Sequence, residues 1–136
     1  MTSTEIIQEV FVKVRHTMRY ETDMKNYGLK EHWRSWASEI EEGIKGIKDD
    51  CDAYALTFAE MLVNRGIKKE HVAIGFCSLQ GGGHLVCLVF DEAKGEWIVL
   101  DNNVINPARK DSLKDYEWIS CMYLNNPGPN NWVKLT

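Results

Sequence analysis

The chain has 136 residues, 44% of them hydrophobic and 26% charged, and a formal net charge of −4. This length and balance fit one globular domain over residues 1–136 and exclude a disordered or fibrous chain. The acidic balance argues against a nucleic-acid-binding protein, which needs a basic face to displace counterions from phosphate. No apolar run approaches the roughly 20 residues that span a bilayer, and the charged N-terminus does not resemble a signal sequence. We therefore expect a cytoplasmic protein without a membrane partner.

The N-terminal segment is predicted to form an amphipathic helix. Apolar residues recur three and four positions apart over residues 4–20, with charged residues between them. Either Ser3 or Thr4 is expected to cap the start of this helix, because a side-chain hydroxyl can accept a bond from a free N–H group of the first turn. The following segment, residues 21–35, is polar and irregular.

Two further helices are predicted before the middle of the chain. Residues 36–43 fit a short helix that Ser38 caps and Gly43 ends. Residues 50–65, rich in alanine, leucine and methionine, fit a stronger helix that stops at Gly66. Because this second helix is apolar on more than one face, we expect it to be central and largely buried.

The second half of the chain is predicted to form strands. Short glycine-bearing links at residues 80–83 and 92–95 suggest that the first three strands form an antiparallel meander. Helices followed by strands are typical of an α+β fold with a helix packed on an antiparallel sheet. The predicted strands are residues 71–79, 84–90, 96–100 and 116–124.

One of the four cysteines stands apart from the others. The chain has no C-x-x-C pair, which argues against a zinc ribbon or a thioredoxin-type site. Cys51 lies in the first turn of the helix predicted at 50–65, where the positive end of the helix dipole stabilises a thiolate and free N–H groups can bind an oxyanion. The aspartates beside it raise the pKa of the thiol. We therefore expect Cys51 to need a nearby imidazolium to react.

The other cysteines are predicted to be small packing residues. Cys77 and Cys87 would face each other if the hairpin between their strands turned symmetrically about residue 82, whereas Cys121 lies on another strand. Trp36 has two interpretations, as a donor of its indole N–H to an oxyanion or, more commonly, as a packing anchor.

A histidine and an aspartate are candidates to assist Cys51. His84 opens a strand after three glycines, and Asp101 ends the next strand. If these strands pair, both residues lie at the same edge of the sheet, and the carboxylate can accept a bond from the imidazole and hold its tautomer. Asn102 is an alternative orienting residue. The three residues would supply a nucleophile, a base and an orienting acid. Singly, each has a plainer interpretation: a core thiol, a solvated turn histidine and a turn-forming aspartate.

These segments together resemble the bacterial transglutaminase-like cysteine proteinases, a family of the papain-like and transglutaminase-like superfamily. The family pattern has a tryptophan about fifteen residues before a D-C segment, followed by H-A-V-L and then L-D-N. The resemblance covers roughly residues 30–135. The matching segments are Trp36-Ala37-Ser38, Asp50-Cys51-Asp52-Ala53-Tyr54-Ala55, His84-Leu85-Val86-Cys87-Leu88-Val89 and Leu100-Asp101-Asn102, with Tyr116, Gly128 and Trp132 farther along.

The resemblance implies a papain-like/transglutaminase-like α+β core, in which the helix that begins at Cys51 packs on an antiparallel β-sheet. It implies a thiol hydrolase, most simply a cysteine peptidase of bacterial or phage origin, acting on a protein or peptide substrate. Cys51, His84 and Asp101 would form its catalytic triad, and Trp36 and Asn102 would line the site. Two alternatives remain open: acyl transfer to an amine, as in transglutaminases, and a catalytically silent binding module of the same fold.

The resemblance also raises the question of calcium, although the chemistry itself requires no cofactor. In some members of the family, acidic residues flanking the cysteine bind calcium, and Asp50 and Asp52 match those positions. Two carboxylates are few for an ion that takes six to eight oxygens, so a role at the helix N-terminus is preferred. The chain departs from the family pattern where Lys48 and Asp49 replace glycines and Ala53 replaces an acid.

Overall fold

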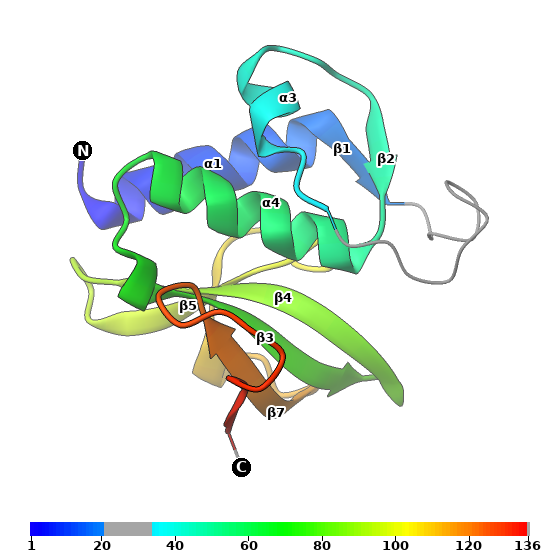
Figure 1. Ribbon diagram of the computed structural model, residues 1–136, viewed down its shortest axis with the longest axis vertical. Helices are drawn as coiled ribbons and strands as arrows, with labels where there is room; N and C mark the ends of the chain where they lie inside the picture. Colours follow the sequence, from blue (N-terminus) through cyan, green and yellow to red (C-terminus); the bar gives the residue numbers. More distant parts are fainter. Residues whose placement is uncertain (21–33, 136) are drawn as a thin grey trace.

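The computed structural model describes residues 1–20 and 34–135 and confirms the predicted α+β fold (Figure 1). The segment expected to be irregular, 21–35, lies almost entirely outside these residues. In the described part of the chain, helices lie on one side of a six-stranded antiparallel sheet. The helices are α1 (Ser3–Thr17), α3 (Ala37–Glu41) and α4 (Cys51–Asn64). The strands are β1 (Met18–Tyr20), β2 (Ile47–Asp49), β3 (Val72–Leu79), β4 (Gly82–Asp91), β5 (Glu96–Leu100), β6 (Ala108–Arg109), β7 (Tyr116–Tyr123) and β8 (Val133–Lys134).

The sheet contains the predicted meander at its centre. Its strand order is β6-β5-β4-β3-β7-β8, so β3, β4 and β5 are neighbours in sequence and in space. The fourth predicted strand, β7, returns to the other side of β3 and pairs with it antiparallel. The edge strands β6 and β8, each two residues long, carry too short a pattern to be recognised from sequence.

The turn between β3 and β4 fixes which residues of the hairpin face each other. Gln80 and Gly81 both have positive φ, 53° and 80°, as in a two-residue hairpin turn with the twist of its strands. The register places Cys77 opposite His84. The condition under which Cys77 and Cys87 would face each other is not met, because the turn is centred between residues 80 and 81 instead of at 82. Cys87 packs beneath the helices, and Cys77 packs on the opposite face of the sheet.

The residue that caps the start of α1 differs from the two residues that were predicted to cap it. The N-cap is Thr2, whose hydroxyl accepts from the Glu5 N–H while the Glu5 carboxylate accepts from the Thr2 N–H, forming a capping box. Ser3 and Thr4, the predicted caps, instead donate to the buried carboxylate of Asp91 at 2.5 and 2.6 Å. These bonds fasten α1 to the end of β4.

The end of α1 leads into a small parallel sheet that was not predicted. The helix ends at Thr17 and not at residue 20, and β1 then pairs in parallel with β2. The register places Tyr20 opposite Asp49, two residues before Cys51. The segment that leads into α4, expected to be a loop, is thus held by backbone hydrogen bonds.

Helix α3 is shorter than the predicted helix at 36–43. Ser38 lies inside it and does not cap it. The hydroxyl of Ser35 accepts from the backbone N–H of Ala37 at 3.1 Å. Gly43 follows the helix with a φ of 91°, in agreement with its predicted role as a stop.

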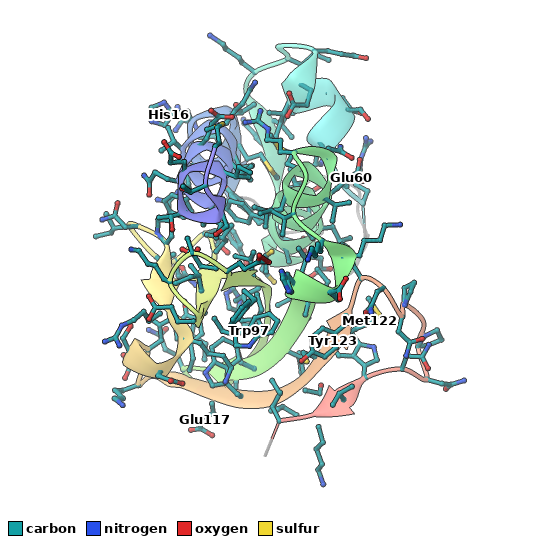
Figure 2. The ribbon with its side chains drawn as sticks, turned by 90° about the vertical axis from the view of Figure 1, so that its left-hand side faces the viewer. His16, Glu60, Trp97, Glu117, Met122 and Tyr123 are labelled. Atoms are coloured by element: carbon teal, nitrogen blue, oxygen red, sulfur yellow. The ribbon has the colours of Figure 1, made fainter. Side chains whose placement is uncertain are left out.

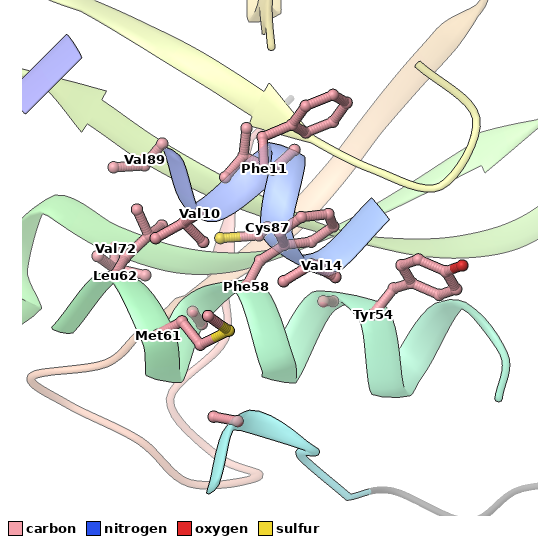
Figure 3. Packing of buried hydrophobic residues seen from close by; sticks show 14 of the residues in the cluster. Val10, Phe11, Val14, Tyr54, Phe58, Met61, Leu62, Val72, Cys87 and Val89 are labelled. Carbon is pink, nitrogen blue, oxygen red and sulfur yellow. The ribbon is translucent and has the colours of Figure 1, made fainter. Parts of the chain in front are cut away.

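The main hydrophobic core lies between the helices and the sheet. Figure 3 shows residues of α1 and α4 packed with residues of β3 and β4. The rings of Phe11 and Phe58 stack with centroids 5.9 Å apart, and Phe58 and Leu62 are fully buried. The prediction that α4 is central and buried is confirmed. Among the described residues, no helix has the length and apolar character needed to cross a bilayer.

The opposite face of the sheet carries a second, smaller cluster. Small and branched side chains of β3, β4, β5 and β7 form its base, and the partly buried side chains that cover them are mostly aromatic. In Figure 2, His16 and Glu60 mark the helices, and Trp97 and Tyr123 belong to the sheet. The rings of Trp97 and Tyr123 meet edge to face at 6.0 Å. Each face of the sheet thus has its own packed layer.

Candidate active site

Cys51 is the first residue of α4 and is half-buried. The N–H groups of a helical first turn have no partner within the helix. Asp50 occupies the N-cap position, but its side chain makes no cap hydrogen bond. Of the N-terminal role preferred for Asp50 and Asp52, the structure keeps their positions at the start of α4 but not a side-chain cap by Asp50. The cysteine stands beside backbone donors that can hold a developing negative charge.

The surroundings of Cys51 keep its thiol protonated at neutral pH. Burial raises the pKa of Cys51 to about 12, the charges of Asp52 and Asp50 add to the rise, and a bond from the Leu85 N–H opposes it. Sγ lies 3.5 Å from Oδ1 of Asp52 and donates to it. Since the helix terminus alone does not ionise this thiol, a base must remove its proton.

His84 is buried near the start of β4 and bonds to Asp101. Its Nε2 lies 2.8 Å from Oδ1 and 2.9 Å from Oδ2 of Asp101. A carboxylate only accepts hydrogen bonds, so Nε2 carries the proton in the neutral ring and Nδ1 is left as an acceptor. The Sγ of Cys77, across the strand pair, donates to the His84 carbonyl at 3.5 Å. His84 thus has one nitrogen held by a carboxylate and one nitrogen available as a base.

Asp101 is held from three directions. It follows β5 directly and is 1% exposed. Besides His84, the backbone N–H of Asn102 donates to Oδ1 at 2.8 Å, and the hydroxyl of Tyr116 donates to Oδ2 at 2.6 Å. The pairing of Cys87 with Leu100 sets the two strands so that His84 and Asp101 meet, as the hairpin argument predicted.

Tyr116 was not predicted as a site residue. It appeared only as one position of the family pattern, because a single tyrosine at the start of a strand carries no chemical signal in sequence. The pairing of β7 with β3, which places Tyr116 opposite Leu79, brings it to the end of the sheet where Asp101 lies.

Cys51 and His84 line the same pocket, which has a volume of about 500 Å³. A larger groove of about 860 Å³ lies along α1 and α3, but neither residue lines it, so size alone does not locate the reactive groups. The rest of the smaller pocket is mainly apolar or aromatic, with one carboxylate. Its other residues are Asp52, Phe76, Gly83, Leu85, Ser120 and Trp132.

The structure corrects the roles considered for Trp36 and Asn102. The indole N–H of Trp36 donates to Oδ2 of Asp49 at 2.7 Å, and the Arg34 guanidinium lies 3.5 Å from the ring centroid. Trp36 is thus a packing and anchoring residue, not an oxyanion donor. Asn102 does not orient His84, because Asp101 holds Nε2. Its side-chain Oδ1 is buried without a hydrogen-bond partner among the described residues, and it lies outside the pocket lining.

Three buried aspartates precede or begin α4. Asp49, Asp50 and Asp52 are 0%, 8% and 7% exposed. Within residues 1–20 and 34–135, however, no group of three or more histidine, cysteine, aspartate or glutamate side chains is arranged to hold a metal ion. Calcium takes six to eight oxygens, so the carboxylates of the described residues do not by themselves form a calcium site.

Comparisons with solved structures find the same fold in Legionella pneumophila LapG. One LapG structure matches with a TM-score of 0.71 and 16% identity, covering 98% of this chain and 69% of that one. A calcium-bound form matches with a TM-score of 0.73 and 16% identity, covering 97% and 68%. An EGTA-treated form matches with a TM-score of 0.69 and 18% identity, covering 88% and 63%. At these identities the likeness shows the fold, and the chain spans about two thirds of the length of LapG.

No curated protein sequence matches this chain significantly. A family model does match, over residues 1–136, and its description is bacterial transglutaminase-like cysteine proteinase, BTLCP. The match covers the whole sequence and agrees with the resemblance found in the motifs. The chain belongs to the bacterial transglutaminase-like cysteine proteinase family and is a cysteine peptidase of the transglutaminase-like type.

Proposed function

We propose that the protein hydrolyses peptide bonds of a protein or peptide substrate, with Cys51 as nucleophile, His84 as acid and base, and Asp101 as the orienting residue. The observation that carries this proposal is the His84–Asp101 hydrogen bond at 2.8 Å in the pocket that Cys51 also lines. A nucleophile, a base within the same pocket and a third group that orients the base are the requirements of covalent catalysis.

The reaction begins with transfer of the Cys51 thiol proton to Nδ1 of His84. The thiolate sulfur then bonds to the carbonyl carbon of the scissile peptide, and the carbonyl π electrons move to oxygen. The N–H of Cys51, at the start of α4, faces this oxyanion. On collapse of the intermediate the C–N bond breaks, and His84 gives its proton to the departing amine. A thioester between Cys51 and the acyl part of the substrate remains.

Water completes the cycle. His84 takes a proton from the water as its oxygen bonds to the thioester carbon, and the C–S bond then breaks with return of the proton to Cys51. Asp101 stabilises the imidazolium in both halves, since its carboxylate accepts the Nε2 proton throughout. The products are one carboxylic acid and one amine, and the enzyme is restored.

None of these steps is routed through calcium. The calcium-bound and EGTA-treated LapG structures raise the question for this chain, where Asp50 and Asp52 would contribute carboxylate oxygens. Two carboxylates are few for an ion that takes six to eight oxygens, so we propose that Asp50 and Asp52 serve the N-terminus of α4 and that EGTA changes neither the thermal midpoint nor the rate at which Cys51 is alkylated. A rise of the midpoint with added calcium chloride would show that the ion binds the folded protein and would contradict this expectation.

The decisive experiment determines whether the acyl group of the substrate is transferred to water or to an amine. A library of synthetic peptides is incubated with the protein in ¹⁸O-labelled water, with Cys51→Ala as the matched inactive variant. We expect cleaved peptides that carry one ¹⁸O at each new C-terminus, and none with the variant. If an added primary amine instead becomes covalently attached to glutamine side chains of the peptides, the protein is a transamidating enzyme. If no peptide changes and Cys51 is alkylated no faster than a free thiol, the protein is a silent binding module.

A further inference from the structure

We propose that Tyr116 is a positioning residue of the catalytic site, which fixes the Asp101 carboxylate through its hydroxyl group. This inference rests on the proposed function, since it concerns the residue that orients the catalytic histidine. The hydroxyl of Tyr116 lies 2.6 Å from Oδ2 of Asp101, a short distance of the kind found when an O–H group donates to a charged oxygen.

The bond from Tyr116 completes the set of donors around the carboxylate. Oδ1 accepts from the backbone N–H of Asn102 at 2.8 Å, and Nε2 of His84 lies within 2.9 Å of both oxygens. Without the tyrosine, the donors other than His84 would all lie on one oxygen, and the carboxyl plane could turn about its bond to Cβ. With the tyrosine, each oxygen has a fixed donor, and the plane that His84 faces is set.

Tyr116 is itself held in place by neighbouring rings. It stacks on Trp118 with centroids 5.6 Å apart and an interplanar angle of 27°. It also meets the ring of His84 edge to face, at 6.3 Å and 65°. The tyrosine thus contacts both members of the hydrogen-bonded pair. Burial and the bond to Asp101 raise the pKa of Tyr116 well above the ordinary value, so its hydroxyl remains protonated and a donor at neutral pH.

The hydrogen bond from Tyr116 also weakens the electrostatic attraction between Asp101 and a protonated His84. A donor on Oδ2 draws negative charge away from the carboxylate, so Asp101 attracts the imidazolium less strongly than it would without Tyr116. Removing the hydroxyl should therefore strengthen the hold of Asp101 on a protonated His84. The other titratable groups around this pair are Cys51 and Asp52 on α4, Cys77 on β3 and Tyr20 on β1.

The test compares Tyr116→Phe with Tyr123→Phe. Tyr123 lies on the same strand, is half-buried and packs on Trp97, but its hydroxyl makes no bond to Asp101. The readout is the pH at which the Cε1–H resonance of His84 reaches the midpoint of its change. We expect this midpoint to rise by about 0.5–1 pH unit in Tyr116→Phe, a roughly 3- to 10-fold increase in proton affinity, and to stay unchanged in Tyr123→Phe.

The same substitution, made in a protein that already carries Asp101→Asn, separates positioning from a general structural effect. Since Tyr116 acts through the charge of Asp101, Tyr116→Phe should leave the His84 midpoint unchanged when Asp101→Asn is already present. If Tyr116→Phe does not fold, the hydroxyl proton of Tyr116 is observed in the wild-type protein. We expect a downfield resonance that moves upfield in Asp101→Asn.

The outcomes for this inference and for the proposed function are distinct. The role of Tyr116 is overturned if the His84 midpoint is the same in the wild type and in Tyr116→Phe. It is also overturned if the hydroxyl resonance does not move in Asp101→Asn. Both results count even when wild-type Cys51 is alkylated rapidly. If wild-type Cys51 reacts no faster than a free thiol, the catalytic proposal fails, whatever the effect of Tyr116→Phe on His84.

Discussion

Replacing His84 by alanine should make Cys51 almost inert. In the folded protein, burial and the nearby aspartates give the thiol a pKa of about 12. At pH 7 only about 1 in 10⁵ such thiols is ionised, compared with roughly 3% of a free cysteine whose pKa is about 8.5. The thiolate fraction is therefore roughly 3,000-fold smaller than that of a free thiol. In the proposed mechanism, His84 removes this disadvantage in the wild-type protein by accepting the thiol proton.

The difference in alkylation rate is smaller than the difference in ionisation, because a more basic thiolate is a better nucleophile. With a Brønsted coefficient of about 0.4–0.5, a pKa that is higher by about 3.5 units makes the thiolate about 25–55 times more nucleophilic. The net expectation is that Cys51 in His84→Ala reacts with iodoacetamide about 100-fold more slowly than N-acetylcysteine at pH 7. In the wild-type protein, Cys51 should react at least as fast as N-acetylcysteine.

The assay is the rate of carbamidomethylation at Cys51, followed by peptide mass spectrometry from pH 5 to 9. His71→Ala is the matched control, because His71 lies directly before β3, at the end of a 3-10 turn over Lys69–His71, and not in the Cys51 pocket. The centroid of its ring lies 5.3 Å from that of Phe90. The buried thiols Cys77 and Cys87 serve as internal references. The reasoning is refuted if His84→Ala labels Cys51 within threefold of the wild-type rate.

Two other substitutions test the scaffold. Asp91→Asn should lower the free energy of unfolding by about 1–3 kcal/mol in urea denaturation, because two hydroxyl donors lose a charged acceptor. Burial raises the pKa of Asp91, but its hydrogen bonds lower it by more, so the pKa in the folded protein lies below the ordinary value of 3.8. The loss of stability should therefore be full above pH 4 and should shrink as the pH falls below 3.8. The control Asp111→Asn changes an exposed aspartate and should show no such loss. Gly83→Ala should cost about 1 kcal/mol, since its Cβ would lie 3.1 Å from the ring of Phe76, whereas Gly82→Ala has only a contact at 3.8 Å. Equal stabilities of the two alanine variants would contradict this packing argument.

The candidate triad could be found in the sequence because short-range rules place its members. A strong helix that begins at Cys51 and a hairpin that joins the strands of His84 and Asp101 each depend on local patterns, namely apolar periodicity and glycine-bearing turns. Once two adjacent strands are paired, the start of one and the end of the next must meet at one edge. The bond between His84 and Asp101 follows from that topology.

The features that escaped prediction depend on contacts between distant segments. The sequence alone does not show that β1 pairs with β2, because three-residue strands have no usable pattern. Nor does it show that Ser3 and Thr4 leave the cap position to Thr2, since this choice depends on the buried carboxylate of Asp91, about 88 residues away. Tyr116 reaches Asp101 only because β7 pairs with β3, a connection that local propensity does not encode.

The electrostatic state of Cys51 was predicted only in part. Its place at the helix start and the opposing effect of neighbouring aspartates were visible in the sequence. The extent of burial, which dominates the rise of its pKa, depends on the tertiary structure. The same holds for Trp36, whose indole N–H is taken by Asp49, a residue that only the folded chain brings next to it.

The attachments of α1 have a consequence for the order in which the chain acquires its structure. Near its start, Ser3 binds Asp91, and near its end, the guanidinium of Arg15 binds the carbonyl of Val104, so both anchors are residues made 88 and 89 positions later. During translation, α4, which packs on the apolar side of α1, emerges before either of these two anchors. The hairpin of β3 and β4 closes over a few residues and can form early, whereas the two anchoring bonds of α1 form only after residues 91 and 104 have left the ribosome. Fastening of both ends of α1 is thus expected late in folding, and nascent chains should hold the ends of this helix loosely until residue 104 has been released from the exit tunnel.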